Sequence, residues 1–220
     1  MAKELLIVYL IIAITAVTSY MGFANYTRND LFDRFKFHIG SILGADRQWD
    51  RLITSALLHA DWMHLLFNMM TFYFFAPFVV YAFGVWKFLA VYFGAVVGGN
   101  LVTLWMHRKS YSYSAIGASG GVVGILFAVI AIAPHVGIRF FFIPVDIPAW
   151  IFGAGYLFFS IYAMRKQIGN IGHDAHLGGA AVGLITAIIY APETLIHNTI
   201  YVVANIIPLA ILAYYIWQER

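Results

Sequence analysis

The sequence AIGASGGVVGILFAVIAIA, residues 115–133, carries no charged side chain and a single hydroxyl group, that of Ser119. Its length is close to the roughly 20 apolar residues that an α-helix needs to cross the hydrocarbon core of a bilayer. Glycines surround the serine at positions 117, 120 and 121. The stretch therefore predicts a membrane-spanning helix that begins with a serine among glycines.

Comparable apolar runs lie on both sides of this stretch, at Glu4–Met21, Trp62–Phe83, Trp86–Met106, Ile147–Met164 and Ala175–Ala191. Together with residues 115–133 they predict an all-α membrane protein, a polytopic helical bundle with six core transmembrane helices. The first run lacks the strongly basic start and the cleavage site of a signal peptide. We therefore expect it to be retained as a span.

The last stretch, Leu195–Trp217, is also apolar but is interrupted by Asn198, Asn205 and Pro208. It predicts either a kinked seventh span or a helix lying at the membrane surface, and we favour the seventh span. We accordingly divide the chain into a six-helix core, residues 1–192, and an apolar C-terminal segment, residues 193–220.

The composition excludes several classes of protein. Of the 220 residues 62% are hydrophobic and 10% are charged, which is far from the average of soluble proteins. The chain has no cysteine, which rules out disulfides, thiol nucleophiles and cysteine-based metal sites. A net charge of only +3, without a long basic run, argues against nucleic acid as a partner. The partner that the composition does imply is the lipid bilayer.

Two connections between the predicted spans have unusual compositions. Residues 25–51 mix basic, acidic and aromatic side chains, which predicts a folded loop at the membrane surface. The connection Pro134–Pro148 combines Arg139 and Asp146 with three consecutive phenylalanines, residues 140–142, and also predicts a surface segment.

Three predicted spans contain glycines four residues apart, a spacing that lets helices approach closely in lipid. The pairs are Gly94 and Gly98, Gly120 and Gly124, and Gly179 and Gly183. They predict that the fourth and sixth spans approach until side chains near their starts touch.

Polar side chains within membrane spans are expensive and point to function. His64 and Asn68 share one face of the second predicted span, Ser119 begins the fourth, and His176 begins the sixth. A serine hydroxyl becomes nucleophilic when a neutral histidine accepts its proton, so Ser119 and His176 are a candidate pair. His64, Asn68 and the backbone amide of Ser119 could then stabilise an oxyanion. The flanking glycines leave room for a substrate backbone.

Two residues close to His176 require separate interpretation. Asp174 precedes it by two residues and would face another side of the helix, so we interpret Asp174 as the N-cap of the sixth span rather than as a third catalytic residue. His173 lies one turn earlier, and we interpret it as a surface neighbour. The sequence thus predicts a Ser–His dyad.

The order and context of three motifs resemble those of the rhomboid intramembrane serine proteases. The motifs are H-x-x-x-N at His64–Asn68, G-x-S-G at Gly117–Gly120 and A-H-x-G-G at Ala175–Gly179, and the resemblance covers about residues 51–183. It implies that residues 1–192 form a catalytic core in which Ser119 and His176 are the dyad. His64, Asn68 and Ser119 would form the oxyanion hole.

The resemblance also implies structural roles and partners. Arg51 and His59 would support the fold around the site, together with Gly117, Gly120 and Gly179. The substrates would be single-span membrane proteins, cut near the outer face without a metal or another cofactor. The protein would lie in the plasma, or inner, membrane with its active site open to the outer side.

The sequence departs from the family pattern at two places. The tryptophan of the family's W-R pair is displaced by one residue, since the chain reads Trp49-Asp50-Arg51. Many relatives place an aromatic residue four positions after the serine, beneath the histidine, where this chain has Val123. Either another aromatic side chain fills that space or His176 is held more loosely.

Other mechanisms fit less well. A zinc protease needs a motif such as H-E-x-x-H, but the glutamates, at positions 4, 193 and 219, do not lie beside paired histidines. A pair of aspartates within separate spans, as an aspartyl protease requires, is absent from the sequence. The alternatives that remain are a catalytically inert rhomboid-like protein that binds membrane helices and a transporter. An inert relative would typically lack Ser119 or His176.

The charges conflict with the orientation that the resemblance implies. With the N-terminus in the cytoplasm, the outer connections carry nine basic residues: Arg28, Arg34, Lys36, Arg47, Arg51, Arg108, Lys109, Arg165 and Lys166. The cytoplasmic side keeps Lys3, Lys87 and Arg139, so the positive-inside rule predicts the reverse. We follow the resemblance, because the basic residues of the first connection alternate with acidic ones and suit a folded element.

Overall fold

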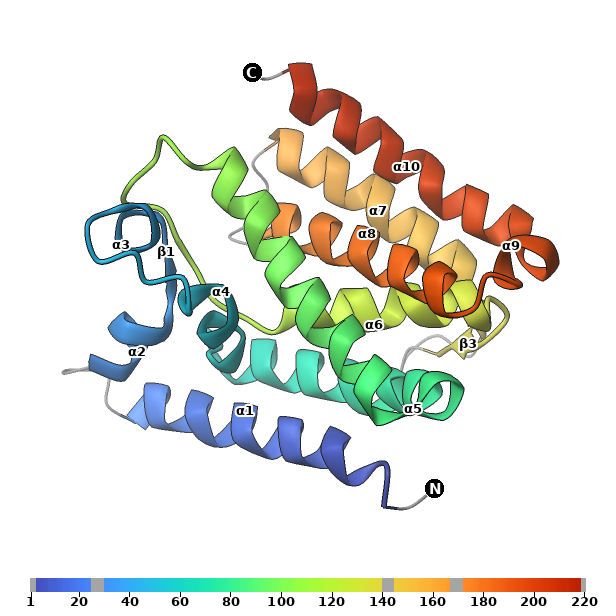
Figure 1. Cartoon of the computed structure of the whole chain (residues 1–220), viewed down its shortest axis with the longest axis horizontal. Helices are drawn as coiled ribbons and strands as arrows, with labels where there is room; N and C mark the ends of the chain where they lie inside the picture. Colours follow the sequence, from blue (N-terminus) through green and yellow to red (C-terminus); the bar gives the residue numbers. More distant parts are fainter. Residues whose placement is uncertain (1–2, 25–29, 140–144, 167–171, 219–220) are drawn as a thin grey trace.

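The computed structural model describes residues 3–24, 30–139, 145–166 and 172–218, and it is mainly helical (Figure 1). The long helices are α1 (Leu6–Ala24), α5 (Trp62–Met106), α6 (Ser119–Ile132), α7 (Ala149–Lys166), α8 (His173–Tyr190) and α10 (Thr199–Gln218). The short ones are α2 (Asp30–Phe35), α3 (Ile39–Leu43), α4 (Arg51–Thr54), the 3₁₀ turn η1 (Ser55–Leu57) and α9 (Thr194–His197). The all-α prediction is confirmed, and every predicted apolar run contains a helix.

Two helices of the described chain are long and apolar enough to cross a membrane by length and composition, Leu6–Phe23 of α1 and α5. The stretches Ser119–Ile132, Ala149–Ala163 and Thr199–Ile211 are apolar but shorter. The number of six core spans therefore stays a prediction.

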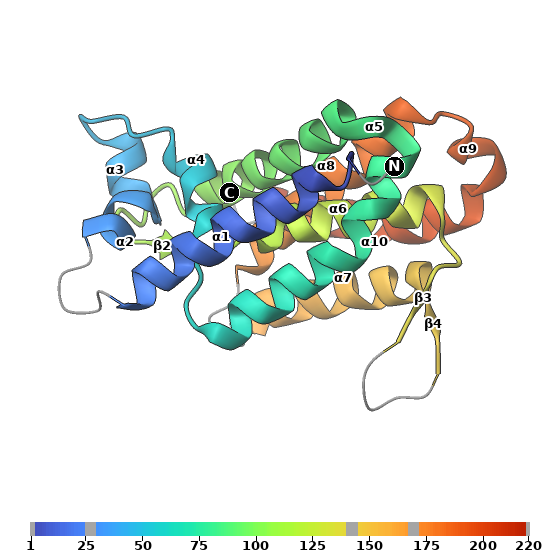
Figure 2. The same ribbon diagram turned by 90° about the horizontal axis from the view of Figure 1, so that it is seen from below.

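Helix α5 combines the second and third predicted spans. Gly84 interrupts the helix with φ 77° and ψ 169°. Residues other than glycine rarely adopt this backbone conformation. Each arm on either side of Gly84 exceeds the roughly 20 residues that cross a bilayer. The two arms are visible as differently directed segments in Figures 1 and 2.

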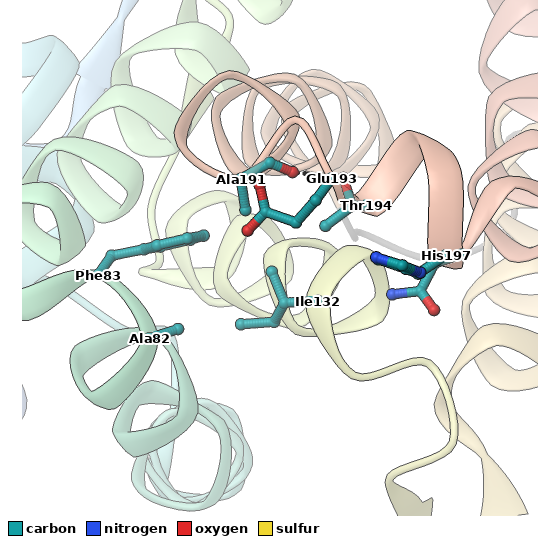
Figure 3. Close-up of a pocket in the computed structure, with 8 residues that line it drawn as sticks. Ala82, Phe83, Ile132, Ala191, Glu193, Thr194 and His197 are labelled. Carbon is teal, nitrogen blue, oxygen red and sulfur yellow. Dashed lines mark hydrogen bonds between the residues drawn. The ribbon is translucent and has the colours of Figure 1, made fainter.

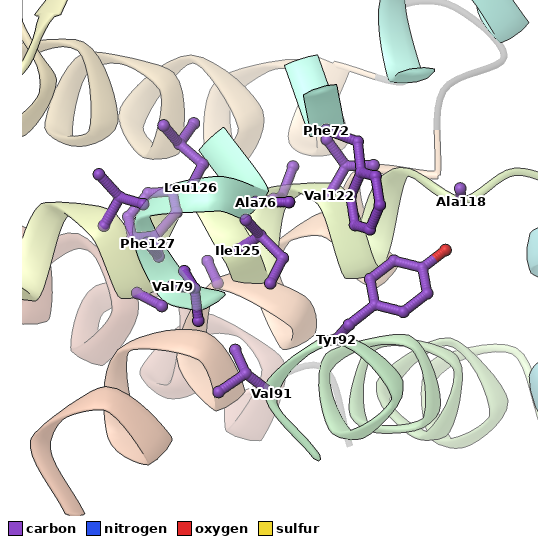
Figure 4. Packing of buried hydrophobic residues seen from close by; sticks show 14 of the residues in the cluster. Phe72, Ala76, Val79, Val91, Tyr92, Ala118, Val122, Ile125, Leu126 and Phe127 are labelled. Atoms are coloured by element: carbon purple, nitrogen blue, oxygen red, sulfur yellow. The ribbon is translucent and has the colours of Figure 1, made fainter. Parts of the chain in front are cut away.

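Helix α6 lies at the centre of the bundle. Every residue from Gly120 to Ala131 is buried, so no face of this helix is left for solvent or lipid. Figure 4 shows its side chains Val122, Ile125 and Phe127 packed among residues of both arms of α5, such as Phe72 and Tyr92. A helix that is apolar on all sides is stable only in such a buried position. Its first residue, Ser119, precedes this buried stretch and is itself half-buried.

Glycines bring α6 and α8 into backbone contact. A side chain added at Gly179 would collide with the carbonyl oxygen of Gly120, and one added at Gly183 would collide with that of Gly124. The predicted close approach of these two helices is confirmed.

In the described residues, two pairs of very short antiparallel strands join segments of the connections between the long helices. β1 (Phe37–His38) pairs with β2 (Ser114–Ala115), and β3 (Gly137–Ile138) pairs with β4 (Ile147–Pro148). The first pair holds the segment before Ser119 against the first connection. The second pair joins the two sides of the Pro134–Pro148 connection, whose phenylalanines 140–142 lie outside the described residues.

The described part of the first connection is folded, as predicted. Arg34 pairs with Asp50 at 2.6 Å, and Lys36 pairs with Asp33 at 2.7 Å. These basic side chains are thus neutralised within the element, while Arg28 lies outside the described residues.

The C-terminal segment forms α9 and α10, and α10 lies beside α7 (Figure 1). Asn205 of α10 is fully buried, and its amide donates to the carbonyl oxygens of Tyr201, at 2.8 Å, and Trp150, at 3.5 Å. A side chain added at Gly153 of α7 would lie 2.8 Å from Asn205 Oδ1. The two helices therefore touch at a small residue and a buried amide.

Candidate active site

Ser119 is the first residue of α6. The preceding loop turns at Gly117, whose φ of 128° favours glycine, and the Gly117 amide donates to the carbonyl oxygen of Ser55 at 3.0 Å. A β-carbon at Gly117 would lie 2.9 Å from the His64 ring. Glycine at this position thus lets the loop pass close to His64 and deliver Ser119 to the helix N-terminus.

His176 lies within hydrogen-bond distance of Ser119. The distance from His176 Nε2 to Ser119 Oγ is 2.5 Å, although the residues are 57 positions apart in the sequence. His176 lies on the first turn of α8 and is buried, with 9% of its surface exposed. The glycine contacts between α6 and α8 explain this proximity, because the two helices start at the same level of the bundle.

An aromatic side chain from α7 completes the surroundings of His176. The Tyr156 hydroxyl lies 2.5 Å from His176 Nδ1, and the two rings are stacked with centroids 6.1 Å apart. An aromatic side chain therefore does pack on His176, and it comes from α7 rather than from position 123. The sequence did not single out Tyr156, and the available signal was a hydroxyl group within an apolar span combined with the missing aromatic at position 123.

Two of the three residues predicted for the oxyanion hole, His64 and Asn68, lie on the first turns of α5, and the third, Ser119, begins α6. Asp61 caps this helix by accepting from the His64 amide at 2.8 Å. His64 Nδ1 accepts from the Ala60 amide at 3.5 Å, which leaves Nε2 as the nitrogen that carries a proton. Asn68 is buried, and its amide donates to the His64 carbonyl oxygen at 3.0 Å. The ring of His64 and the Ser119 hydroxyl both lie beside Gly117.

His59 ties the serine loop to α1. Its Nε2 accepts from the Ala118 amide at 3.4 Å, so Nδ1 carries the proton and donates to Ser19 Oγ at 3.0 Å. The Ser19 hydroxyl donates in turn to the Leu57 carbonyl oxygen. Burial lowers the pKa of His59 to about 3, so the ring is neutral at pH 7.

Arg51 lies in the first connection and supports it from inside. Its guanidinium is buried and donates to the carbonyl oxygens of Asp33, at 2.8 Å, and Lys36, at 2.6 Å, and to the Gln48 side chain. Burial lowers the pKa of Arg51, but the group stays charged because its ordinary pKa is so high.

The interpretations of Asp174 and His173 were wrong. Gly172, not Asp174, occupies the N-cap of α8, and Asp174 is buried with its Oδ2 3.3 Å from His107 Nε2. His173 is also buried, with 6% of its surface exposed, and packs against Phe159. Both side chains turn inward because α8 begins inside the bundle rather than at its surface.

A pocket lies at the other end of the bundle and is separate from this site (Figure 3). It is lined by Ala82, Phe83, Ile132, Ala191, Glu193, Thr194, His197 and Asn198. Ile132 ends α6 and Ser119 begins it, so the length of this helix, roughly 20 Å, separates the two places. Within the described residues no group of three or more His, Cys, Asp or Glu side chains could hold a metal ion.

The profile of the rhomboid domain matches residues 46–193, more than half of the chain. The protein belongs to the rhomboid family. Members of this family are membrane proteins, and the match includes Ser119, His176, His64 and Asn68.

Individual rhomboid relatives agree with this assignment. The chain is 28% identical over 137 residues to Rhomboid protein 1, mitochondrial, of Saccharomyces cerevisiae, an alignment that covers 61% of this chain and 40% of the relative. It is 33% identical over 150 residues to RHOMBOID-like protein 12, mitochondrial, of Arabidopsis thaliana, covering 61% and 44%. It is 42% identical over 81 residues to the rhomboid protein YdcA of Bacillus subtilis, covering 37% and 40%. The matches thus span about two fifths of each relative's length.

Proposed function

We propose that this rhomboid protein is an intramembrane serine endopeptidase that cleaves transmembrane segments of other membrane proteins. One observation carries the proposal: the Ser119 hydroxyl lies 2.5 Å from His176 Nε2 at the starts of helices α6 and α8. A nucleophile paired in this way with a base is the minimal arrangement for acyl transfer from a peptide bond.

The chemistry follows from the roles of the two side chains. His176 Nε2 takes the proton of Ser119 Oγ while that oxygen attacks the carbonyl carbon of the scissile bond, and the resulting imidazolium protonates the leaving amine. Water then attacks the acyl-enzyme carbonyl while His176 takes a proton from the water. The imidazolium returns this proton to Ser119 Oγ as the carboxylic acid product leaves.

Three groups would stabilise the oxyanion that forms in each step. The Ser119 amide belongs to the first turn of α6, where backbone N–H groups have no partner within the helix. The Asn68 amide and the protonated Nε2 of His64 come from α5. Donors of this kind that are already in place contribute more in a water-poor site than in solution.

The fold supports the division of the chain that the sequence suggested. We propose that residues 1–192 form the catalytic core and that residues 193–220 add a helix beside α7. The family match ends at residue 193, next to this boundary. Whether the core crosses the membrane six times and α10 a seventh time belongs to the same proposal.

The substrates would be single-span membrane proteins. A hydrogen-bonded helix hides its carbonyl groups from a nucleophile, so cleavage requires a segment that unwinds near the active site. Neither a metal nor another cofactor takes part in this mechanism, and nucleic acid has no role in it.

For the location we propose the plasma, or inner, membrane with Ser119 facing the outer side. YdcA comes from a bacterium, whereas the other two relatives are named as mitochondrial proteins. The ion pairs Arg34 with Asp50 and Lys36 with Asp33 support this orientation, because they remove basic charge that would otherwise favour the inner side.

Purified protein in detergent or liposomes tests the proposal with a generic transmembrane reporter and a fluorophosphonate probe. We expect cleavage of the reporter and labelling of Ser119 alone, both abolished in Ser119→Ala and in His176→Ala. The double variant should be scarcely worse than either single one, because the two side chains act as a unit. Chelators should change neither signal.

Other results would contradict the proposed protease function. Cleavage that survives Ser119→Ala, or a label on another residue, excludes the dyad. A folded wild-type protein that binds membrane helices without cutting them would instead be an inert rhomboid-like protein, and one that moves a solute would be a transporter.

A further inference from the structure

Both ring nitrogens of His176 have a side-chain partner. Nε2 lies 2.5 Å from Ser119 Oγ and Nδ1 lies 2.5 Å from the Tyr156 hydroxyl, so three helices each contribute one member of a hydrogen-bonded row. The dyad chemistry explains the contact with Ser119. It leaves the contact with Tyr156 without a function.

We propose that Tyr156 is the positioning residue of His176: its hydroxyl oxygen accepts the Nδ1 proton and so selects the tautomer in which Nε2 can take the proton of Ser119. This inference rests on the proposed protease function.

The reasoning starts from the proton count of a neutral imidazole, which carries one proton on one of its two nitrogens. A base must present a lone pair to Ser119, so the proton of the reactive tautomer is on Nδ1. That N–H needs an acceptor, and the Tyr156 oxygen is the side-chain atom in place to accept it. When Nε2 takes the serine proton, the bond from Nδ1–H to Tyr156 persists and strengthens, and Tyr156 itself keeps its proton.

Ser160 lies one turn further along α7 and is fully buried, and its hydroxyl forms no hydrogen bond with the described residues. The hydrogen-bonded row therefore runs from Ser119 to His176 and ends at Tyr156, with Ser119 and His176 each donating toward Tyr156 in the proposed arrangement.

A phenol suits this position better than a carboxylate. In a Ser-His-Asp triad an aspartate accepts from Nδ1, but an unpaired carboxylate within a membrane span is expensive. The nearest aspartate in sequence, Asp174, is directed toward His107, at 3.3 Å. A neutral tyrosine supplies an acceptor and also a ring that stacks on the imidazole.

Packing fixes where Tyr156 lies. Gly153, three residues earlier on α7, is so close to Ile130 of α6 and Asn205 of α10 that any added side chain would meet them. Phe152, four residues earlier, stacks its ring on Tyr156 with centroids 6.2 Å apart. The register of α7 against the bundle is therefore set within one turn of the hydroxyl.

The same heavy-atom positions allow an opposite proton arrangement, and the two have opposite consequences. If Tyr156 donated its proton to Nδ1, then Nε2 would carry the imidazole proton and could not accept from Ser119. The hydroxyl would then hold the enzyme in an unreactive form, and its removal would raise activity.

Replacing Tyr156 by phenylalanine keeps the ring and removes only the hydroxyl. Under the proposal kcat for the reporter falls by about 10- to 100-fold while KM stays the same. The fall is smaller than the roughly 10⁴-fold known for a triad forced into the wrong tautomer, because phenylalanine releases the ring without forcing it. Tyr162→Phe is the matched control, since Tyr162 lies on the same helix with its side chain exposed, and it should behave as wild type.

A second measurement does not depend on activity. The ¹⁵N chemical shifts of His176, in protein labelled at histidine and assigned by comparison with His176→Ala, report which nitrogen carries the proton. We expect the proton on Nδ1 in the wild type and in Tyr162→Phe, and a mixture of tautomers in Tyr156→Phe.

The two measurements distinguish failure of the role of Tyr156 from failure of the protease function. A wild-type ring protonated on Nε2, or a kcat in Tyr156→Phe that is unchanged or raised, overturns the role of Tyr156. If the wild type cuts no reporter, the protease function fails, and the chemical shifts still decide whether Tyr156 selects the tautomer. Should Tyr156→Phe lower the melting temperature, the ¹⁵N shifts of the wild type still decide the proposal, because they do not depend on that variant.

Discussion

Gly179 of α8 lies directly against the carbonyl oxygen of Gly120 of α6, with no space for a β-carbon between them. This contact joins the helices that carry His176 and Ser119, and it lies one residue after Ser119 on one side and three residues after His176 on the other. The distance between the Ser119 and His176 side chains therefore depends on residue 179 having no β-carbon.

We predict that Gly179→Ala separates α6 from α8 and abolishes cleavage, with a clear fall in the melting temperature. The added β-carbon would meet backbone atoms, which cannot move aside as a flexible side chain could. The matched control is Gly155→Ala on α7, where a β-carbon would meet nothing within 4 Å. Reporter cleavage and thermal unfolding in detergent measure both variants. Wild-type activity in Gly179→Ala would show that the backbone contact does not set the geometry.

The sequence predicted the parts of the site that depend on local chemistry. Ser119 among glycines and His64 with Asn68 on one helix face were recognisable because motif spacing and helix period place them. The positions of the long helices were predictable because each of them lies in a long apolar run. The prediction that α6 and α8 meet at their starts also followed from residue type, since glycines are what close packing in lipid requires.

Tyr156 was missed for a physical reason. It lies in a helix that also contains other aromatic residues, among them Phe152, Phe158 and Phe159, and in a mainly apolar run the sequence does not show which face turns inward. Only the contact of α7 with α6 and α10 at Gly153 determines that face. Asp174 was misinterpreted because N-cap preference is a local rule, whereas its burial beside His107 depends on the end of α5.

Membrane orientation can be tested with single cysteines, because the native chain contains none. Asp46 and Glu193 are both exposed, Asp46 in the first connection and Glu193 at the end of the bundle opposite Ser119. We predict that Asp46→Cys in intact cells reacts with an impermeant maleimide and that Glu193→Cys reacts only after the membrane is permeabilised. The opposite pattern would show that the positive-inside rule, rather than the family resemblance, gives the orientation.

Asn68 should matter more for turnover than for folding. In the structure its amide donates to the His64 carbonyl oxygen one turn earlier. In the proposed mechanism the same amide would donate to the oxyanion. We predict that Asn68→Ala lowers kcat by roughly 10²–10³-fold, as expected for loss of an oxyanion donor. Thr71→Ala removes a similar hydrogen bond to a carbonyl oxygen one turn earlier on the same helix and should leave kcat unchanged. If Asn68→Ala and Thr71→Ala have the same kcat, Asn68 contributes to packing and not to stabilisation of the oxyanion.

Acid should destabilise the fold through His59. Burial holds its pKa at about 3 in the folded protein, whereas a histidine in an unfolded chain titrates near 6.5. Between these two values the unfolded chain binds a proton that the folded chain does not, so each step down in pH favours unfolding. The stabilisation is complete above about pH 6.5 and is lost progressively as the pH falls toward 3.

Thermal unfolding in detergent between pH 7.5 and 4.5 measures this dependence. His59→Gln cannot gain a proton in this range, and its side-chain oxygen can still accept from the Ala118 amide. We therefore predict a less stable protein at pH 7.5 whose melting temperature falls less steeply on acidification than that of the wild type. His135→Gln, at an exposed position, should retain the wild-type slope. If His59→Gln and the wild type lose stability in parallel, the acid sensitivity of the fold comes from other groups and the neutral His59 that bridges Ser19 and Ala118 does not contribute to it.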